Sequence, residues 1–257
     1  MEQIKKWILA LALSVVALPS WAQFATPTQF IPVPMEKEPM RFFINLNSAQ
    51  LFQNGGAGGR SDLINLQLNA GLIYNVFMGV DLGLGFHAGT FSPYGMFRNV
   101  NLTAPAAQYG GMFGLDVMMR YTAMLTDIFY AGIQYQVGYS YTDWAPGFSD
   151  AEFTALGSSS AGAARSFIPM NLGLVLGADF ADFISAYVFP AFEFGQTFKS
   201  SSDTGIWKSA IGMQINTGVD FRTEIGDINV QVSPRIANLD SSKTWGMNYN
   251  LGMAWNF

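Results

Sequence analysis

The sequence contains no cysteine among its 257 residues and only one histidine. The lack of cysteine excludes a disulfide framework, a thiolate metal site and a lipid-anchored amino terminus. A single histidine excludes a metal site built from several histidines. We therefore expect neither a metal site nor a cofactor.

Long apolar runs are missing from the chain after its amino terminus. Residues 1–22 contain Lys5 and Lys6, the short apolar core "WILALALSVVAL" and the small residues of "PSWAQ", a combination typical of a cleaved secretory signal peptide. An uncleaved membrane anchor is the alternative interpretation. Further along, Asp179 and Asp182 interrupt the most apolar stretch, 172–189. No run of about 20 apolar residues therefore offers a helical membrane span.

Charged residues are also few, at 12% of the chain, against about 25% in a typical soluble domain. The whole chain holds 13 basic and 18 acidic residues, and loss of residues 1–22 would remove two lysines and one glutamate. Such an acidic chain is not expected to bind nucleic acid. Half of the residues are nevertheless hydrophobic. Without a helical span, this apolar surface must be covered in another way.

The chain does contain a repeated alternation of apolar and polar residues. At the carboxy terminus, "WGMNYNLGMAWNF" (245–257) is apolar at every second position, which is typical of a β-strand with two different faces. The same period of two recurs in segments 62–76, 80–89, 113–121, 129–141, 168–178, 211–221 and 228–236. Two further segments, 40–46 and 184–194, are weaker. Including both predicts ten strands, and leaving both out predicts eight.

Apart from Asp62 at the start of its segment, the charged residues of these segments lie on the polar face. A soluble β-sandwich, the alternative fold, would place charged residues on its water-facing surface. A charge facing lipid near the bilayer centre costs roughly 2–4 kcal/mol, which explains an uncharged outer face. A bilayer also tolerates no open sheet edge. Residues 39–257 are therefore predicted to form an all-β, closed antiparallel transmembrane β-barrel.

The predicted connections alternate between long and short. Segments 91–110 and 143–166 are long, whereas those near 77–79 and 125–127 are tight turns. Long extracellular loops and short periplasmic turns are the pattern of outer-membrane barrels. Both termini are then expected on the periplasmic side, which requires an even number of strands.

The chain resembles the small bacterial outer-membrane β-barrels, and its last residues carry the most specific match. The resemblance implies an integral outer-membrane protein in contact with lipid. It also implies that the barrel-assembly machinery recognises a terminal strand that ends in an aromatic residue. The matching residues are Tyr249, Leu251, Met253, Trp255 and Phe257.

Residues 23–38, "QFATPTQFIPVPMEKE", contain several prolines and do not alternate like a strand. We interpret them as a periplasmic segment that precedes the barrel. A short plug folded into the lumen is the alternative. The glycines of "GLGFHAG" (83–89) are expected to leave room inside a narrow barrel.

The inward-facing polar side chains form the candidate site, a network that lines the lumen. Asp81 and Arg120 are expected to form an ion pair. The predicted network comprises Asp81, His87, Asp116, Arg120, Gln134, Glu193, Gln214 and Arg235. The His-x-Ser pair of barrel lipid hydrolases is not matched, because Gly89 follows His87 at the second position. A Ser–His–acid arrangement would need loop serines. We therefore expect no enzyme.

A narrow lumen limits the functions that remain. An eight-stranded barrel is about filled by its own side chains, so ten strands leave at most a thin passage. We predict a narrow channel or a transport protein for small molecules, apolar solutes included. The alternative is a surface-interaction protein, or a structural barrel of the envelope. That alternative would act through loops 91–110 and 143–166 and would have an extracellular partner.

Overall fold

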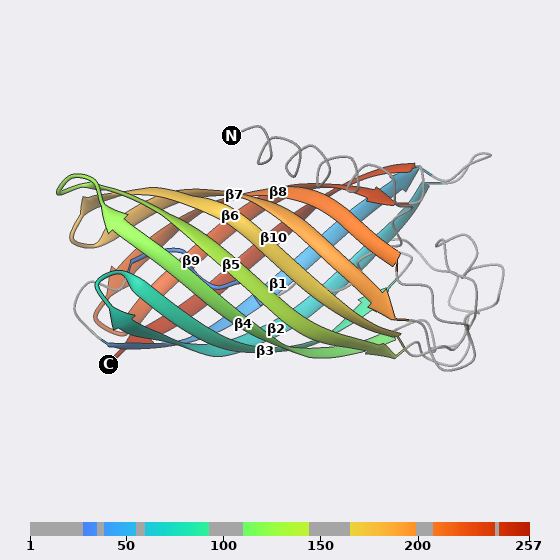
Figure 1. Ribbon diagram of the computed structural model, residues 1–257, viewed down its shortest axis with the longest axis horizontal. Helices are drawn as coiled ribbons and strands as arrows, with labels where there is room; N and C mark the ends of the chain where they lie inside the picture. The colour runs from blue at the N-terminus through green and yellow to red at the C-terminus, as the bar shows by residue number, and fades with distance from the viewer. Residues whose placement is uncertain are drawn as a thin grey trace, which may run out of the picture.

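The computed structural model describes residues 28–34, 39–54, 60–92, 110–143, 165–198, 208–239 and 242–257. These residues form ten antiparallel strands that close into one barrel, seen from the side in Figure 1. The ten strands confirm the larger of the two predicted numbers, and the weakly patterned segments are β1 and β7. The strands are β1 (Met40–Asn54), β2 (Arg60–Phe77), β3 (Val80–Ser92), β4 (Gly110–Met124), β5 (Phe129–Asp143), β6 (Arg165–Ala181), β7 (Ile184–Phe198), β8 (Lys208–Thr223), β9 (Gly226–Leu239) and β10 (Ser242–Asn256).

The barrel closes where the first strand pairs with the last. β1 and β10 are antiparallel, with Arg41 opposite Asn256 and Leu46 opposite Leu251. The backbone N–H of Phe257 donates to the carbonyl of Met40 at 2.8 Å. Every other strand pairs with its neighbours in the sequence. The predicted pairing of the terminal strand with the segment near 40–50 is therefore confirmed.

The two ends of the barrel differ. Residues 78–79, 125–128, 182–183 and 224–225 connect strands at one end, here called the turn end, where β1 begins and β10 stops (Figure 1). At the other end, here called the loop end, the strands lead to residues 55–59, 93–109, 144–164, 199–207 and 240–241, which lie outside the described residues. The assignment of the turn end to the periplasm stays a prediction.

Each strand presents an apolar face to the outside and a mostly polar face to the lumen. On β3, outward Leu84 is 57% exposed, whereas inward His87 is fully buried. The outward set continues around the barrel and includes Leu68, Leu115, Ile133, Leu174, Phe192, Val230 and Leu251. A band of exposed apolar side chains this large is unfavourable in water and favourable against lipid. The predicted transmembrane barrel is thus confirmed by its surface as well as by its topology.

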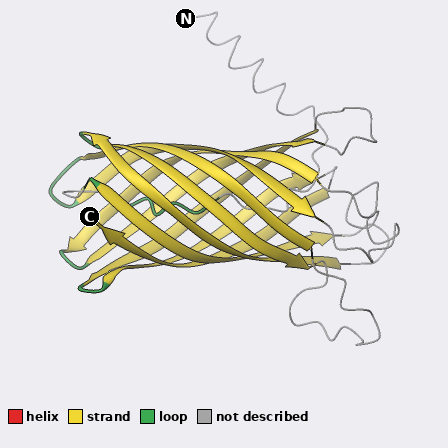
Figure 2. Cartoon of the chain, turned by 90° about the horizontal axis from the view of Figure 1, so that it is seen from below, coloured by secondary structure: helices red, strands yellow, loops and turns green. Residues whose placement is uncertain are grey.

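The lumen is not polar throughout. Toward the turn end, buried Phe43, Ile73 and Met118 from the wall pack with Phe30 and Ile31. The alternation in β2 already marks Ile73 as an exception, because it is the apolar residue on the polar face. The rings of Phe30 and Phe43 meet edge to face, with centroids 5.3 Å apart. Segment 28–34, which supplies Phe30 and Ile31, runs inside the barrel in Figure 2.

Candidate functional site: a plugged lumen

Residues 28–34, here called the plug segment, lie within the barrel rather than outside it. Thr28, Ile31 and Val33 are each at most 1% exposed. The segment enters near the turn end, where the Val33 carbonyl accepts a bond from Arg41, and reaches Asp116 near the middle of β4. Residues 28–34 therefore lie where the plug alternative expects them, and burial of their apolar side chains accounts for this position. The assignment of 23–38 to the periplasmic side of the barrel stays a prediction.

Side chains of the wall satisfy the backbone of the plug segment. This matters because an extended peptide that pairs with no strand would otherwise leave its polar groups buried and unbonded. The wall residues come from strands on several sides of the lumen, and they donate in four of the five bonds and accept in the fifth. The bonds run from Arg41 Nη1 to Val33 O (3.3 Å), Arg120 Nη1 to Ile31 O (2.6 Å), Asn45 Nδ2 to Gln29 O (2.5 Å), Gln136 Nε2 to Thr28 O (2.8 Å) and Thr28 N to Asp116 Oδ2 (3.0 Å).

Two glycines on the inner face of β3 make room for the plug segment. A Cβ atom on Gly85 would lie 2.7 Å from Cγ2 of Thr28, and one on Gly83 would lie 2.7 Å from Cε1 of Phe30. Real Cβ atoms do not approach other heavy atoms so closely. Any other residue at these positions would therefore press on the plug. This gives the glycines of "GLGFHAG" a more specific role than leaving room in a narrow barrel.

Thr28, His87, Asp116 and Ser140 form a hydrogen-bonded group, here called the latch. Asp116 Oδ2 accepts from the Thr28 hydroxyl at 2.6 Å, and it lies 2.7 Å from His87 Nδ1. His87 Nε2 lies 2.7 Å from the Ser140 hydroxyl oxygen. Because a carboxylate only accepts, Nδ1 carries a proton toward Asp116, and Nε2 shares a hydrogen bond with the Ser140 hydroxyl. The latch ties β3, β4 and β5 to the plug segment.

The order Ser140–His87–Asp116 is that of a hydrolase triad. The sequence pattern predicts such an arrangement only with serines from the loops, yet Ser140 lies within β5. All three side chains are fully buried, and Asp116 is also bound to the plug segment. While the plug is in place, Ser140 is closed to a substrate from outside. In this state the latch holds the plug in place through hydrogen bonds.

The other predicted network residues also face the lumen. Arg120 donates to Asp81 Oδ2 from Nε at 2.9 Å and from Nη2 at 2.6 Å, so the expected ion pair is present. Nearer the loop end, Arg235 Nε lies 2.5 Å from Glu193 Oε2. Gln134 and Gln214 are buried as well. The structure thus brings six of the eight predicted residues into three pairs, which are Asp81–Arg120, His87–Asp116 and Glu193–Arg235.

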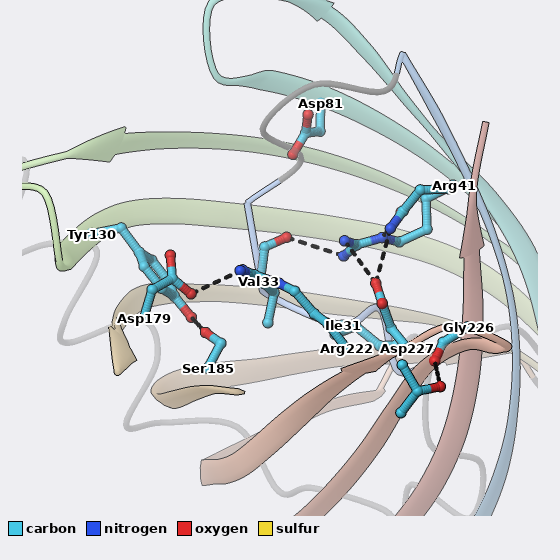
Figure 3. A network of polar contacts seen from close by, with 12 residues as sticks. Ile31, Val33, Arg41, Asp81, Tyr130, Asp179, Ser185, Arg222, Gly226 and Asp227 are labelled. Atoms are coloured by element: carbon cyan, nitrogen blue, oxygen red, sulfur yellow. Dashed lines mark hydrogen bonds and ion pairs between the residues drawn. The ribbon is translucent and has the colours of Figure 1, made fainter. Parts of the chain in front are cut away.

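Sequence reasoning missed Thr28 and Ser140 of the latch, and it also missed the pairing of charges at the turn end. There Arg41 lies 3.4 Å from Asp227, and Arg222 lies 2.9 Å from Asp179. Figure 3 shows how these side chains face one another. The alternation of apolar and polar residues places Ser140 and the paired charges on the inner face of their strands. It carries no signal for which of them meet, because contact depends on register across strands.

The five residues of the proposed assembly signal lie on the outer face of β10 and at the chain end. Tyr249, Leu251 and Phe257 are exposed, and Trp255 stacks on Phe42 of β1 with ring centroids 5.8 Å apart. Met253 is half-buried on the same face. Recognition of these residues by the assembly machinery stays a prediction.

The predicted signal peptide, 1–22, lies outside the described residues, as do the loops 91–110 and 143–166 apart from their ends. In the part of the chain that is described, no helix is long and apolar enough to cross a membrane. The same part contains no group of three or more His, Cys, Asp or Glu side chains that could hold a metal ion.

The sequence matches no protein-family model and no curated protein. The fold is similar to solved structures of outer-membrane barrels. One is an outer-membrane channel from Pseudomonas putida F1, with a TM-score of 0.51 and 10% identity over 90% of this chain and 100% of that one. Another is the beta domain of the Bordetella autotransporter Brka, with a TM-score of 0.50 and 13% identity over 86% and 100%.

Identities this low bear on the fold alone. The lipid-facing surface, the closed sheet and the shared fold together make this chain an integral β-barrel of the bacterial outer membrane.

Proposed function

We propose that this protein is a gated conduit of the outer membrane for small solutes, and that the plug segment is its gate. The observation that carries the proposal is the plug segment within the lumen. If the barrel served only as a stable structure, larger side chains of the wall would fill this space and stabilise it further. Here Gly83 and Gly85 leave the space to another piece of the chain.

The attachment of the plug segment supports reversible opening. None of residues 28–34 belongs to a strand, so the ladder of the barrel does not depend on them. Side chains such as Asn45 and Gln136 hold the plug backbone. Each such bond contributes only about 0.5–1.5 kcal/mol net, because water replaces it when the plug leaves. Displacement would leave a closed barrel whose wall is mostly polar, with an apolar patch at Phe43, Ile73 and Met118.

The other predicted functions rest on residues that are not described. The interaction or structural role was assigned to loops 91–110 and 143–166, and it stays a prediction. The expectation that the protein is not an enzyme also stays a prediction. The gated conduit needs no catalytic step.

Deletion of residues 24–34 tests the gate. In planar bilayers we expect the full chain to show no large, stable conductance. The folded deletion variant should show discrete small steps and raise solute uptake into proteoliposomes by about tenfold or more, since displacement of a few net hydrogen bonds accounts for such a factor. A folded variant that stays as closed as the full chain would overturn the proposal.

A disulfide provides a second test that leaves the plug in the chain. The protein has no cysteine of its own, so Thr28→Cys with Gly85→Cys introduces the sole thiols. The Thr28 Cβ lies 3.0 Å from the position of a Cβ on Gly85, slightly closer than the roughly 3.5–4.5 Å of a disulfide. A small shift of the plug would permit the bond. The oxidised protein should be closed, and reduction should open it. Equal conductance in both states would place the gate elsewhere.

A further inference from the structure

Amide side chains on the lumen wall hold polar groups that no neighbour uses. Both polar atoms of Gln214 and both of Asn248 lack a partner, although each residue is only 1% exposed. An enclosed N–H or C=O group without a partner is costly and is uncommon in native proteins. Among the other described residues, single unpartnered amide atoms belong to Asn45, Asn69, Gln134, Asn171 and Asn250.

Gln214 and Asn248 face the loop-end half of the lumen. They lie in the first halves of β8 and β10, and both strands begin at the loop end. On β9, between these two strands, Arg235 lies opposite Gln214 and Ser233 opposite Asn248. The plug is bound further toward the turn end. These amides therefore border the part of the lumen that a solute entering from the loop end would meet before the plug.

The charged groups of the lumen are engaged with one another instead. The ion pairs are Arg41–Asp227, Arg120–Asp81, Arg222–Asp179 and Arg235–Glu193. Within the described lumen, Asp220 is an exception, because neither of its carboxylate oxygens has a partner, and it lies toward the turn end of β8. Near the loop end, Gln214 and Asn248 offer neutral donors and acceptors close together, and Glu193, paired with Arg235 through Oε2, adds one unpartnered oxygen.

We propose that the opened conduit carries small uncharged solutes that bear hydroxyl or amide groups, and that it discriminates against ions. A hydroxyl group both donates and accepts, so it can satisfy the N–H and the C=O of one amide side chain. An ion would have to give up its hydration shell beside these neutral amides, where the neighbouring Arg235 and Glu193 are already paired with each other. This inference names the solute class of the proposed conduit and rests on that proposed function.

Osmotic swelling of proteoliposomes that hold the variant lacking residues 24–34 tests the solute class. Isosmotic erythritol serves as the uncharged polyhydroxy probe and KCl as the ionic probe. Erythritol should enter about tenfold faster than with the full chain, and KCl should stay close to the full-chain rate. If KCl entered as fast as erythritol, the inference about uncharged solutes would be wrong. The proposed conduit itself would still be supported. Entry of neither probe would overturn the proposed function and, with it, this inference.

Substitution of both amides in the same deletion variant separates recognition from simple sieving. Gln214→Ala with Asn248→Ala widens the passage and removes its hydrogen-bonding groups. If the two amides bind the solute, erythritol uptake should fall by about fivefold, while KCl uptake should not fall. The matched control is Ile215→Ala, which alters the lipid-facing neighbour of Gln214 and should change neither rate. A rise in both rates in the double variant would show a sieve and overturn the inference.

Discussion

At the scale of single residues, Asp116 joins the wall to the plug. Its Oδ2 atom accepts from the hydroxyl and the backbone N–H of Thr28 and from His87. Hydrogen bonds to a charged acceptor are stronger than those between neutral groups. Ser140 in turn holds the His87 ring through Nε2. A small group of side chains therefore holds the part of the plug that lies furthest from the turn end.

Thr28→Val removes the hydroxyl donor while keeping the shape of the side chain. A hydrogen bond to a charged group contributes about 1.5–3 kcal/mol net, and about 1.4 kcal/mol corresponds to a factor of ten. We therefore expect solute uptake into proteoliposomes to rise by about tenfold or more. The matched control is Thr217→Val on the outer face of β8, which should leave uptake unchanged. Unchanged uptake in Thr28→Val would contradict the role of the latch.

At the scale of elements, the plug segment fits against β3. Gly83 and Gly85 alternate with Leu82, Leu84 and Phe86, so this strand is apolar toward lipid and has no side chain at these two inward positions. The alternation in β3 thus provides both an apolar surface for lipid and space for the plug in the lumen. The strand keeps its ladder to β2 and β4 throughout. Its inner face can therefore be altered without disturbing its pairing.

Gly85→Ala should push the plug segment out of place, because the new Cβ would meet Thr28 and Phe30 rather than the strand backbone. We expect faster solute uptake than in the full chain, and no further increase when residues 24–34 are also deleted. The control is Gly111→Ala on β4, where an added Cβ meets nothing within 4 Å. Equal uptake in Gly85→Ala and Gly111→Ala would mean that the plug does not limit passage.

At the scale of the whole molecule, closure and membrane location depend on each other. The ladder between β1 and β10 leaves no open edge to face lipid. The terminal residue takes part in that seal, since Phe257 and Met40 exchange backbone hydrogen bonds of 2.8 and 3.3 Å. The side chain of Phe257 is 62% exposed on the outside. It is therefore placed against lipid rather than in a protein core.

Deletion of Phe257 should impair insertion and leave the chain in the periplasm. The seal would lose its last pair of backbone bonds, and the terminal strand would lose its aromatic end. Fractionation, together with the heat-modifiable mobility of folded barrels in gels, measures the outcome. Phe257→Tyr keeps an aromatic end and should insert normally. Normal assembly of the truncated chain would remove the interpretation of the carboxy terminus as an assembly signal.

The strands, their two faces and the need for closure could all be predicted from the amino-acid pattern. The period of two is a local property, because successive side chains in a strand point to opposite sides. It therefore identified inward residues such as Asp81 and Glu193 correctly, even in strands whose partners were unknown. A charge-free apolar face then left a closed barrel in lipid as the consistent fold.

The contents of the lumen and the contacts between inward residues follow from the folded barrel and could not be predicted from the pattern. His87 and Ser140 lie on strands that are separated by β4, so their contact depends on register across two ladders. The plug segment has no alternation to reveal it, because it belongs to no strand. Side chains distant in the sequence, such as Gln136, hold it by its backbone. Backbone groups are the same in every residue, so no sequence pattern records these bonds.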